Sequence, residues 1–295
     1  MGELTTTVQM EDGARLHVKL LGGGPTSTEK PLLISLHGAP GLSTHLEPLS
    51  SFSHLSNTFR VLVYDARGSG ESDHVGPFTH DRWIQDIENL RRWAGAETFV
   101  LAGASYGGFI ALDYAVEHSD KLRGLILRDT WANGKVGSMA ALANIVTSSR
   151  VKPDVPRQVR LWSGTLYDDK DFEAAVSEIL PFYSPPEDVV QPEDLPESTE
   201  FRGSIKFHSA TANFAFSVNM PQFDVRDKLK NITAPTLVVV GKYDYVTPVA
   251  YSEDIAKSIP NSRLEIFEYS GHSPPSDEPA RFQEILLDFL KTEVL

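Results

Sequence analysis

One serine of the chain stands in a setting typical of a catalytic nucleophile. Ser105 is the serine of GASYGG, a G-x-S-x-G pattern that follows the apolar run Phe99–Ala102 and precedes the helical pattern FIALDYAVEH. In the strand–turn–helix that this pattern forms, small residues around the serine allow a tight turn that exposes its hydroxyl. The nearby helix N-terminus favours developing negative charge. We therefore predict that Ser105 is a nucleophile.

A serine hydroxyl needs a base to act as a nucleophile at neutral pH, and two later residues can form that base. Asp244 follows the apolar run Thr236–Val240, and His272 follows the run Leu264–Phe267. The order Ser, Asp, His along the chain is the one expected after a G-x-S-x-G turn. We predict that His272 accepts the serine proton and that Asp244 orients and stabilises the imidazole.

Three other aspartates lie near strands and could provide the acid. Asp129 follows the apolar run Leu122–Leu127 and is the alternative to Asp244. Asp224 and Asp227 lie before a strand rather than after one and are poorer candidates.

Negative charge that develops on a substrate oxygen needs hydrogen-bond donors. The backbone N–H of Tyr106, directly after the nucleophile, is one expected donor. The second is expected from the loop HGAPG, where we favour Ala39 because Pro40 has no N–H. In the same loop, we expect His37 to organise the backbone and Gly38 to border the substrate.

Short apolar runs place these residues at the ends of strands. Continuous apolar runs of five to seven residues are typical of strands buried on both faces of a parallel sheet. Helical patterns at Trp83–Ala94 and Phe282–Leu290 alternate with them, and this alternation predicts a three-layer α/β fold with ligands at the carboxyl ends of the strands. A hairpin turning at Asp12-Gly13 precedes the parallel part. The expected strands are Leu4–Met10, Arg15–Leu21, Leu32–Leu36, Arg60–Tyr64, Phe99–Ala102, Leu122–Leu127, Thr236–Val240 and Leu264–Phe267.

The alternation stops in one long stretch before the last core strands. Between about Trp131 and Met220 there are broken helical patterns, at Met139–Thr147 and Asp171–Leu180, and a proline-rich acidic connector. Prolines at this density interrupt secondary structure. We predict a cap over the strand ends at residues 131–222, inserted into an α/β core formed by residues 1–130 and 223–295.

Composition excludes several classes of function. The 295 residues include 40 acidic and 27 basic side chains, a net charge of −13, which disfavours nucleic-acid binding. The absence of cysteine excludes disulfides, thiolate metal sites and a cysteine nucleophile. We see no signal peptide and no apolar run of membrane-spanning length. We therefore expect a cytoplasmic monomer or homodimer that needs no metal or cofactor and acts on a small molecule or short peptide.

The motifs resemble those of one known superfamily. HGAPG, DARGSGES, GASYGG, GKYDYVTP and SGH, in that order, are similar to the α/β-hydrolase superfamily and, within it, to proline iminopeptidases. The resemblance covers the whole chain, including the cap. It implies an α/β-hydrolase fold, a catalytic triad at Ser105, Asp244 and His272, and oxyanion donors at Ala39 and Tyr106.

The chain departs from this resemblance where a free amino terminus would bind. The family's aminopeptidases hold the substrate ammonium with a glutamate near the end of the cap, where this chain has Thr211-Ala212-Asn213-Phe214. Some relatives have a second glutamate just after the catalytic aspartate, where this chain has Tyr245. No acid occurs between Glu200 and Asp224. A buried ammonium without a carboxylate is costly. We therefore predict a small amide, ester or lactone substrate, bordered by Asn213, Phe214 and Tyr245, with a true aminopeptidase as the alternative.

Two features of the cap allow more than one chemical class of substrate. Glu173, Glu178 or Glu200 could replace the missing acid. Phenylalanines near the end of the cap either pack it onto the core or line a pocket for an uncharged acyl or ring substrate. They are Phe201, Phe207, Phe214, Phe216 and Phe223.

Other functions fit the sequence less well. Epoxide hydrolases and dehalogenases of this superfamily use aspartate where this chain has Ser105. A C–C bond hydrolase uses the same triad and stays open, whereas the intact triad disfavours a non-catalytic binding protein. A dinucleotide site is disfavoured because Gly68-Ser69-Gly70 lacks the third glycine of G-x-G-x-x-G.

Overall fold

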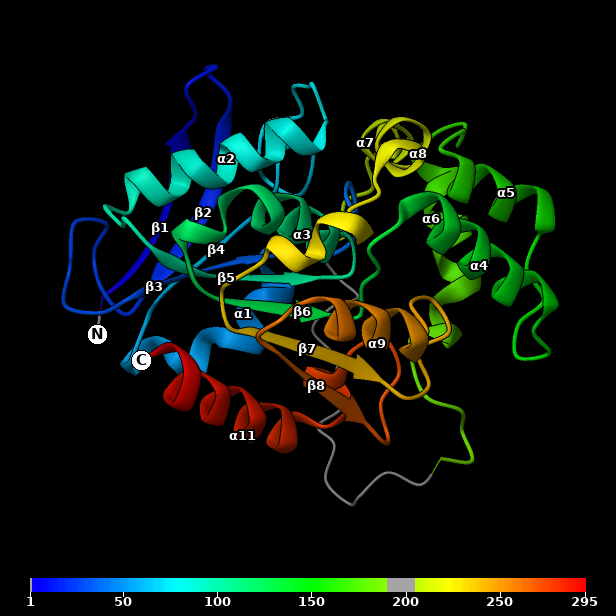
Figure 1. Ribbon diagram of the computed structural model, residues 1–295. Coiled ribbons are helices and arrows are strands. Elements are labelled where there is room, and N and C mark those ends of the chain that lie inside the picture. The colour runs from blue at the N-terminus through cyan, green and yellow to red at the C-terminus, as the bar shows by residue number, and fades with distance from the viewer. Residues whose placement is uncertain (1, 190–204) are drawn as a thin grey trace.

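The computed structural model describes residues 2–189 and 205–295, and a mixed sheet lies at its centre (Figure 1). The eight strands follow the order β1-β2-β4-β3-β5-β6-β7-β8. β1 and β2 form the expected hairpin, β2 is antiparallel to β4, and β4, β3 and β5 to β8 are parallel. All eight strands were predicted, with ends shifted by two residues or fewer. They are β1 (Glu3–Gln9), β2 (Arg15–Leu21), β3 (Leu32–Leu36), β4 (Arg60–Tyr64), β5 (Phe99–Ala104), β6 (Leu122–Arg128), β7 (Thr236–Gly241) and β8 (Ser262–Phe267).

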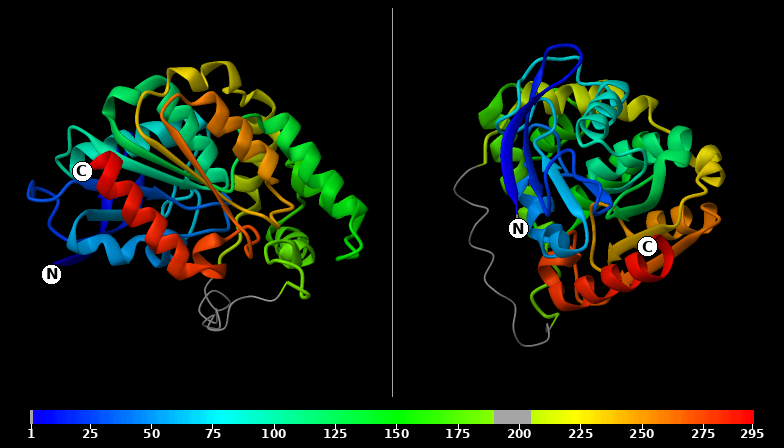
Figure 2. Two further views of the ribbon diagram at one scale, coloured as in Figure 1. Left: turned by 60° about the horizontal axis from the view of Figure 1, so that its bottom comes forward. Right: turned by 90° about the vertical axis from the view of Figure 1, so that its left-hand side faces the viewer.

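The apolar runs form strands because both of their faces are buried. Successive side chains of a strand point to opposite faces, so Ile34 and Leu101 enter one hydrophobic cluster, while Leu33 and Val100 enter the other. Helices α2 (His80–Trp93), α3 (Tyr106–His118) and α9 (Val249–Ser258) contribute to the first cluster, and α1 (Leu46–Phe52) and α11 (Pro279–Phe289) to the second. Figures 1 and 2 show these two helical layers on opposite faces of the sheet.

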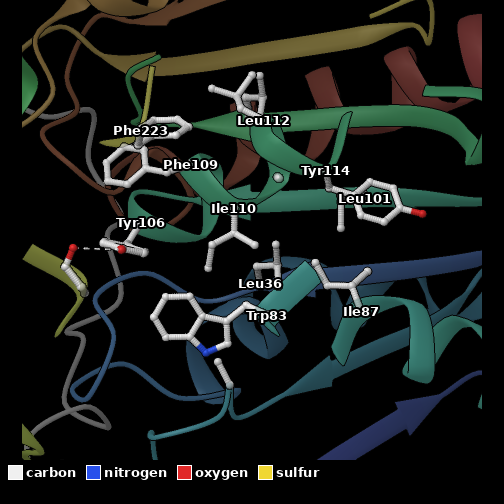
Figure 3. Packing of buried hydrophobic residues seen from close by; sticks show 14 of the residues in the cluster. Leu36, Trp83, Ile87, Leu101, Tyr106, Phe109, Ile110, Leu112, Tyr114 and Phe223 are labelled. Carbon is white, nitrogen blue, oxygen red and sulfur yellow. Dashed lines mark hydrogen bonds between the residues drawn. The ribbon is translucent and has the colours of Figure 1, made fainter. Parts of the chain in front are cut away.

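Helix α3 packs its first turns into the centre of the larger cluster. Figure 3 shows Ile110 facing Leu36 and Trp83, and Phe109 beside Phe223. All five side chains are almost fully buried. The helix that begins at the proposed nucleophile is thus held on several sides, which fixes the position of its N-terminus.

The chain between β6 and β7 forms a group of helices beyond one end of the sheet (Figure 1). Their apolar residues, such as Trp162 and Phe172, belong to the same cluster as one face of the sheet. The stretch therefore shares a hydrophobic core with the sheet, and its assignment as a cap with the boundaries 131 and 222 stays a prediction. The helices are α4 (Gly134–Thr147), α5 (Val155–Ser163), α6 (Asp169–Ile179), α7 (Ser209–Phe214) and α8 (Met220–Gln222).

The remaining elements are short. One helix, α10 (Pro274–Asp277), directly precedes α11. The 3-10 segments are η1 (Ser53–Asn57), η2 (Ser119–Lys121), η3 (Leu180–Phe182) and η6 (Arg226–Asn231), and the π-helical segments are η5 (Ala215–Asn219) and η7 (Leu290–Val294). In the described part of the chain, no helix is both long enough and apolar enough to cross a membrane.

Candidate active site

Ser105 lies in the sharp turn between β5 and α3, as the sequence predicts. Its φ of 52° and ψ of −118° are unfavourable for a residue with a side chain, and such strain is concentrated at functional sites. The turn closes only without side chains beside it. A Cβ on Gly107 would lie 2.5 Å from the carbonyl oxygen of His37, and one on Gly103 would collide with the carbonyl of Gly107.

Asp244 and His272 form a buried pair beyond β7 and β8. The distance between His272 Nδ1 and Asp244 Oδ2 is 2.7 Å, and both residues are buried. The other Asp244 oxygen accepts the backbone N–H groups of Val246 and Thr247, each at 2.8 Å. The two residues that the sequence predicts as acid and base are therefore neighbours in the structure.

Electrostatics favour the charged form of this pair. Burial alone would raise the pKa of Asp244, but the charge and hydrogen bonds of its partners outweigh burial and hold the pKa below its ordinary value. Burial would likewise lower the pKa of His272, yet Asp244 raises it above the ordinary value. An imidazolium that forms next to Asp244 is therefore stabilised.

The end of β6 connects the serine turn to the Asp244–His272 pair. The N–H of Ser105 donates to the carbonyl of Arg128 at 2.8 Å, and Thr130 Oγ1 donates to the carbonyl of Ser105. The intervening residue, Asp129, lies with its carboxylate close to Asp244 and His272. His272 Nε2, which would accept the serine proton, is buried and makes no hydrogen bond within the described residues. Ser105 is thus at the same edge of the sheet but is not hydrogen-bonded to His272, a contact that in unliganded enzymes often forms only with substrate.

The loop after β3 lies against Ser105. A Cβ on Gly38 would be 3.4 Å from Ser105 Cβ, so this loop borders the nucleophile. Among the described residues, neither the N–H of Ala39 nor that of Tyr106 has a hydrogen-bond acceptor, as expected of groups that could hold an oxyanion. His37 Nε2 accepts the N–H of Ala66 at 2.9 Å, so its Nδ1 carries the proton and donates to the carbonyl of Gly38. These bonds agree with an organising role for His37. Burial lowers the pKa of the His37 ring.

The predicted substrate-binding residues differ in their surroundings. Tyr245 lies at the junction of core and cap, where its carbonyl accepts Asn144 Nδ2. The amide of Asn213 is bonded on both sides to the backbone of Leu166, at 2.8 and 2.9 Å, which ties α7 to the connection between α5 and α6. Phe214 packs against Phe78. The contacts that the structure shows therefore bring Gly38 and Tyr245 to the site. They give Asn213 a role within the cap and Phe214 a role in packing the cap on Phe78 of the core.

The candidate acids of the cap are engaged elsewhere or exposed. Glu178 is bound to Arg157 and Gln158 between α5 and α6, and Glu173 is exposed on α6. Glu200 lies outside the described residues, as does Phe201. Among the described phenylalanines, Phe223 is buried against α3 and Phe216 contacts Tyr106 and Trp162. Together with Phe207 on Phe172, these contacts favour packing over a pocket wall.

The sequence did not reveal a cap segment that covers His272. The N–H of His272 donates to the carbonyl of Tyr183 at 2.9 Å, and the two rings meet edge to face at 4.9 Å. Arg150 Nη2 holds this segment through the carbonyls of Pro181, Ser184 and Pro185. No local pattern marks these residues, because the contacts join positions 31 to 89 residues apart.

Among residues 2–189 and 205–295, two groups of side chains each bring three possible metal ligands together. Asp129, Asp244 and His272 form one, and His17, His45 and Asp65 the other, with candidate ligand atoms within 4.8 Å of one another. In each group a histidine nitrogen is already bonded to a carboxylate, at 2.7 Å for His272 and 2.8 Å for His45. The first group includes Asp244 and His272, two members of the predicted triad, whose predicted task is proton transfer rather than metal binding.

Comparisons with known proteins agree with the motifs. A family model described as alpha/beta hydrolase fold matches residues 31–279. A proline iminopeptidase of Saccharolobus solfataricus is 31% identical over 270 residues, covering 88% of this chain and 84% of that protein. A proline iminopeptidase of Pestalotiopsis fici is 29% identical, covering 89% of this chain and 91% of that protein. The structure of an alpha/beta fold family hydrolase from Bacillus anthracis has a TM-score of 0.75 at 24% identity, covering 98% and 99% of the two chains.

Proposed function

The chain belongs to the alpha/beta hydrolase fold family, and we propose that within it Ser105, His272 and Asp244 act as a catalytic triad. One observation supports this proposal above the others. The buried Asp244–His272 pair, at 2.7 Å, lies at the same edge of the sheet as the strained turn of Ser105. This arrangement suits acyl transfer through a serine nucleophile.

In the proposed reaction, each group has one task. His272 Nε2 accepts the proton of Ser105 as the hydroxyl oxygen attacks the substrate carbonyl. The N–H groups of Ala39 and Tyr106 stabilise the oxyanion, and Asp244 stabilises the imidazolium. His272 then gives the proton to the leaving group. Water, activated by the same histidine, hydrolyses the acyl-enzyme.

We infer that the substrate is a small amide, ester or lactone without a buried positive charge. The acids that could hold an ammonium within the described cap are paired with Arg157, as Glu178 is, or exposed, as Glu173 is. Arg150 adds a positive charge beside Tyr245, with its guanidinium carbon 5.2 Å from the ring centre. A cation bound near this point would meet repulsion rather than a partner.

The triad is tested by replacing the nucleophile. Ser105→Ala is expected to lower the turnover of p-nitrophenyl acetate by about 10³-fold or more, and to prevent labelling by a fluorophosphonate. Ser177→Ala, on an exposed face of α6, serves as the control. Full activity of Ser105→Ala, or labelling of another residue in the wild type, would refute the triad.

A second function, a true aminopeptidase, is favoured by the relatives that are named proline iminopeptidases. A substrate panel separates the two proposals: proline and alanine anilides with a free amine, acetyl-blocked proline anilide, p-nitrophenyl esters and lactones. We expect preference for the uncharged substrates. A kcat/KM that is clearly higher for the free-amine anilides would establish the aminopeptidase and contradict our interpretation of the cap.

A further inference from the structure

A second buried carboxyl group lies beside the proposed triad and has no task in the reaction described above. Asp129 directly follows β6 and is 1% exposed. One of its oxygens accepts the N–H of Gly241 at 3.1 Å, and the other is buried without a hydrogen-bond partner among the described residues. Its carboxylate, a carboxylate oxygen of Asp244 and a ring nitrogen of His272 all lie within 4.8 Å of one another.

The backbone of Asp129 holds this position at a cost. Its φ is 50°, and within the described chain only Asp129 and Ser105 combine a side chain with a positive φ. Such a conformation costs about 1–3 kcal/mol and persists only where the surroundings enforce it. Here the N–H of Asp129 donates to the carbonyl of Val239 at 2.9 Å, which fixes the turn at the end of β6. The strain directs the carboxyl group toward the triad.

We propose that Asp129 is a positioning residue for His272, a second acid whose carboxylate supports the imidazolium when Asp244 is not charged. The proposal rests on the triad of the preceding section. In this proposal His272 has two acidic partners, Asp129 after β6 and Asp244 after β7.

The charges around Asp129 explain how the two acids divide this task. Two carboxyl groups this close do not both ionise readily. Burial and the charge of Asp244 raise the pKa of Asp129 well above its ordinary value, so that Asp129 stays protonated while Asp244 carries the charge. The charges of His272 and Arg128 act in the opposite direction and lower this pKa, but Arg128 is paired with Glu47. Without Asp244, the repulsion disappears, and Asp129 can release its proton to water and face His272 as a carboxylate.

A double-mutant cycle with Asp129→Asn and Asp244→Ala tests the proposal. The asparagine keeps an oxygen that can accept the N–H of Gly241. An opposite charge at this distance shifts a pKa by about 1–3 units. Asp129→Asn should therefore lower kcat by about tenfold or more in the Asp244→Ala background, and by much less in the wild-type background. Equal losses in both backgrounds would overturn the proposal.

A second measurement separates positioning from a structural effect. The titration of His272 is followed by NMR in the Ser105→Ala background, which needs no turnover and so stays informative if the proposed function fails. In Asp244→Ala, adding Asp129→Asn should lower the pKa of His272 by about one unit or more. An unchanged pKa of His272 would overturn the proposal. If Asp244→Ala does not fold, Asp244→Asn, which keeps an acceptor for Val246 and Thr247, replaces it in both experiments.

Discussion

Arg150→Met tests whether one cap arginine fixes the segment over His272. The substitution keeps an unbranched apolar stem of similar length to that of arginine and removes the guanidinium. Arg150 Nη2 lies 2.7 Å from the carbonyl oxygen of Pro181, 3.0 Å from that of Ser184 and 3.3 Å from that of Pro185. Because Nη2 carries two N–H groups, it can donate fully to two of these three carbonyls.

The magnitude follows from these contacts. A hydrogen bond to a charged group contributes about 1.5–3 kcal/mol, and a cation over an exposed aromatic ring about 0.5–1 kcal/mol. The guanidinium also lies over Tyr245 and Phe182, but Arg150 is only partly buried, so solvent weakens every contribution. We therefore expect Arg150→Met to lower the free energy of unfolding by about 2–3 kcal/mol.

Two assays distinguish a loss of stability from a loss of positioning. Urea denaturation gives the free energy of unfolding, and the kinetics of ester hydrolysis give kcat and KM. Because Tyr183 covers His272, kcat should fall in Arg150→Met beyond any unfolded fraction. Arg226→Met, which breaks an exposed ion pair with Asp224, is the control and should cost about 1 kcal/mol or less. A loss no larger than this control would refute the role given to Arg150.

Three further predictions follow from the site. His272 must be neutral to act as the base, and Asp244 raises the pKa of His272 despite its burial. We therefore expect kcat/KM to rise with pH through an apparent pKa above 6.5. An apparent pKa below 6.5 would contradict this prediction. Gly107→Ala should destabilise the fold by about 1–3 kcal/mol in denaturant titrations, because its Cβ would meet the carbonyl of His37, whereas Gly24→Ala, with open space around it, should not. Burial raises the pKa of Asp129 in the folded state. The Asp129 carboxyl group therefore lowers the free energy of unfolding more and more as the pH rises from the pKa of this group in the unfolded chain to its pKa in the folded protein. Asp129→Asn should therefore raise Tm more at pH 9 than at pH 5, and an equal shift at both would be evidence against a protonated carboxyl.

The sheet and the Asp244–His272 pair could be predicted from the sequence because their signals are local. Apolar runs mark strands buried on both faces, and Ser105, Asp244 and His272 lie three to five residues after the ends of such runs. Helix α9 (Val249–Ser258) was missed because its sequence, VAYSEDIAKS, carries little apolar periodicity and it is held by packing on β7 and β8.

The surroundings of the site could not be predicted in the same way. The position of Asn213 in the cap predicted a contact with substrate, yet its side-chain amide forms hydrogen bonds with the backbone of Leu166. Tyr183 and Arg150 carry no motif, and their role depends on how a connector crosses the molecule. Hydrogen bonds between distant segments are set by the tertiary path of the chain, which short sequence patterns do not encode.

The hydrophobic cluster that the cap helices share with one face of the sheet has a consequence for thermal unfolding and for engineering. Elements that are buried in one another unfold together, so calorimetry should record one heat-absorption peak for cap and core rather than two. A chimaera that carries a foreign cap would have to match the large apolar surface beneath it, residue by residue, and not only the two junctions of the chain. Changes of specificity are therefore easier to obtain by altering side chains at the rim of the native cap than by exchanging the cap as a module.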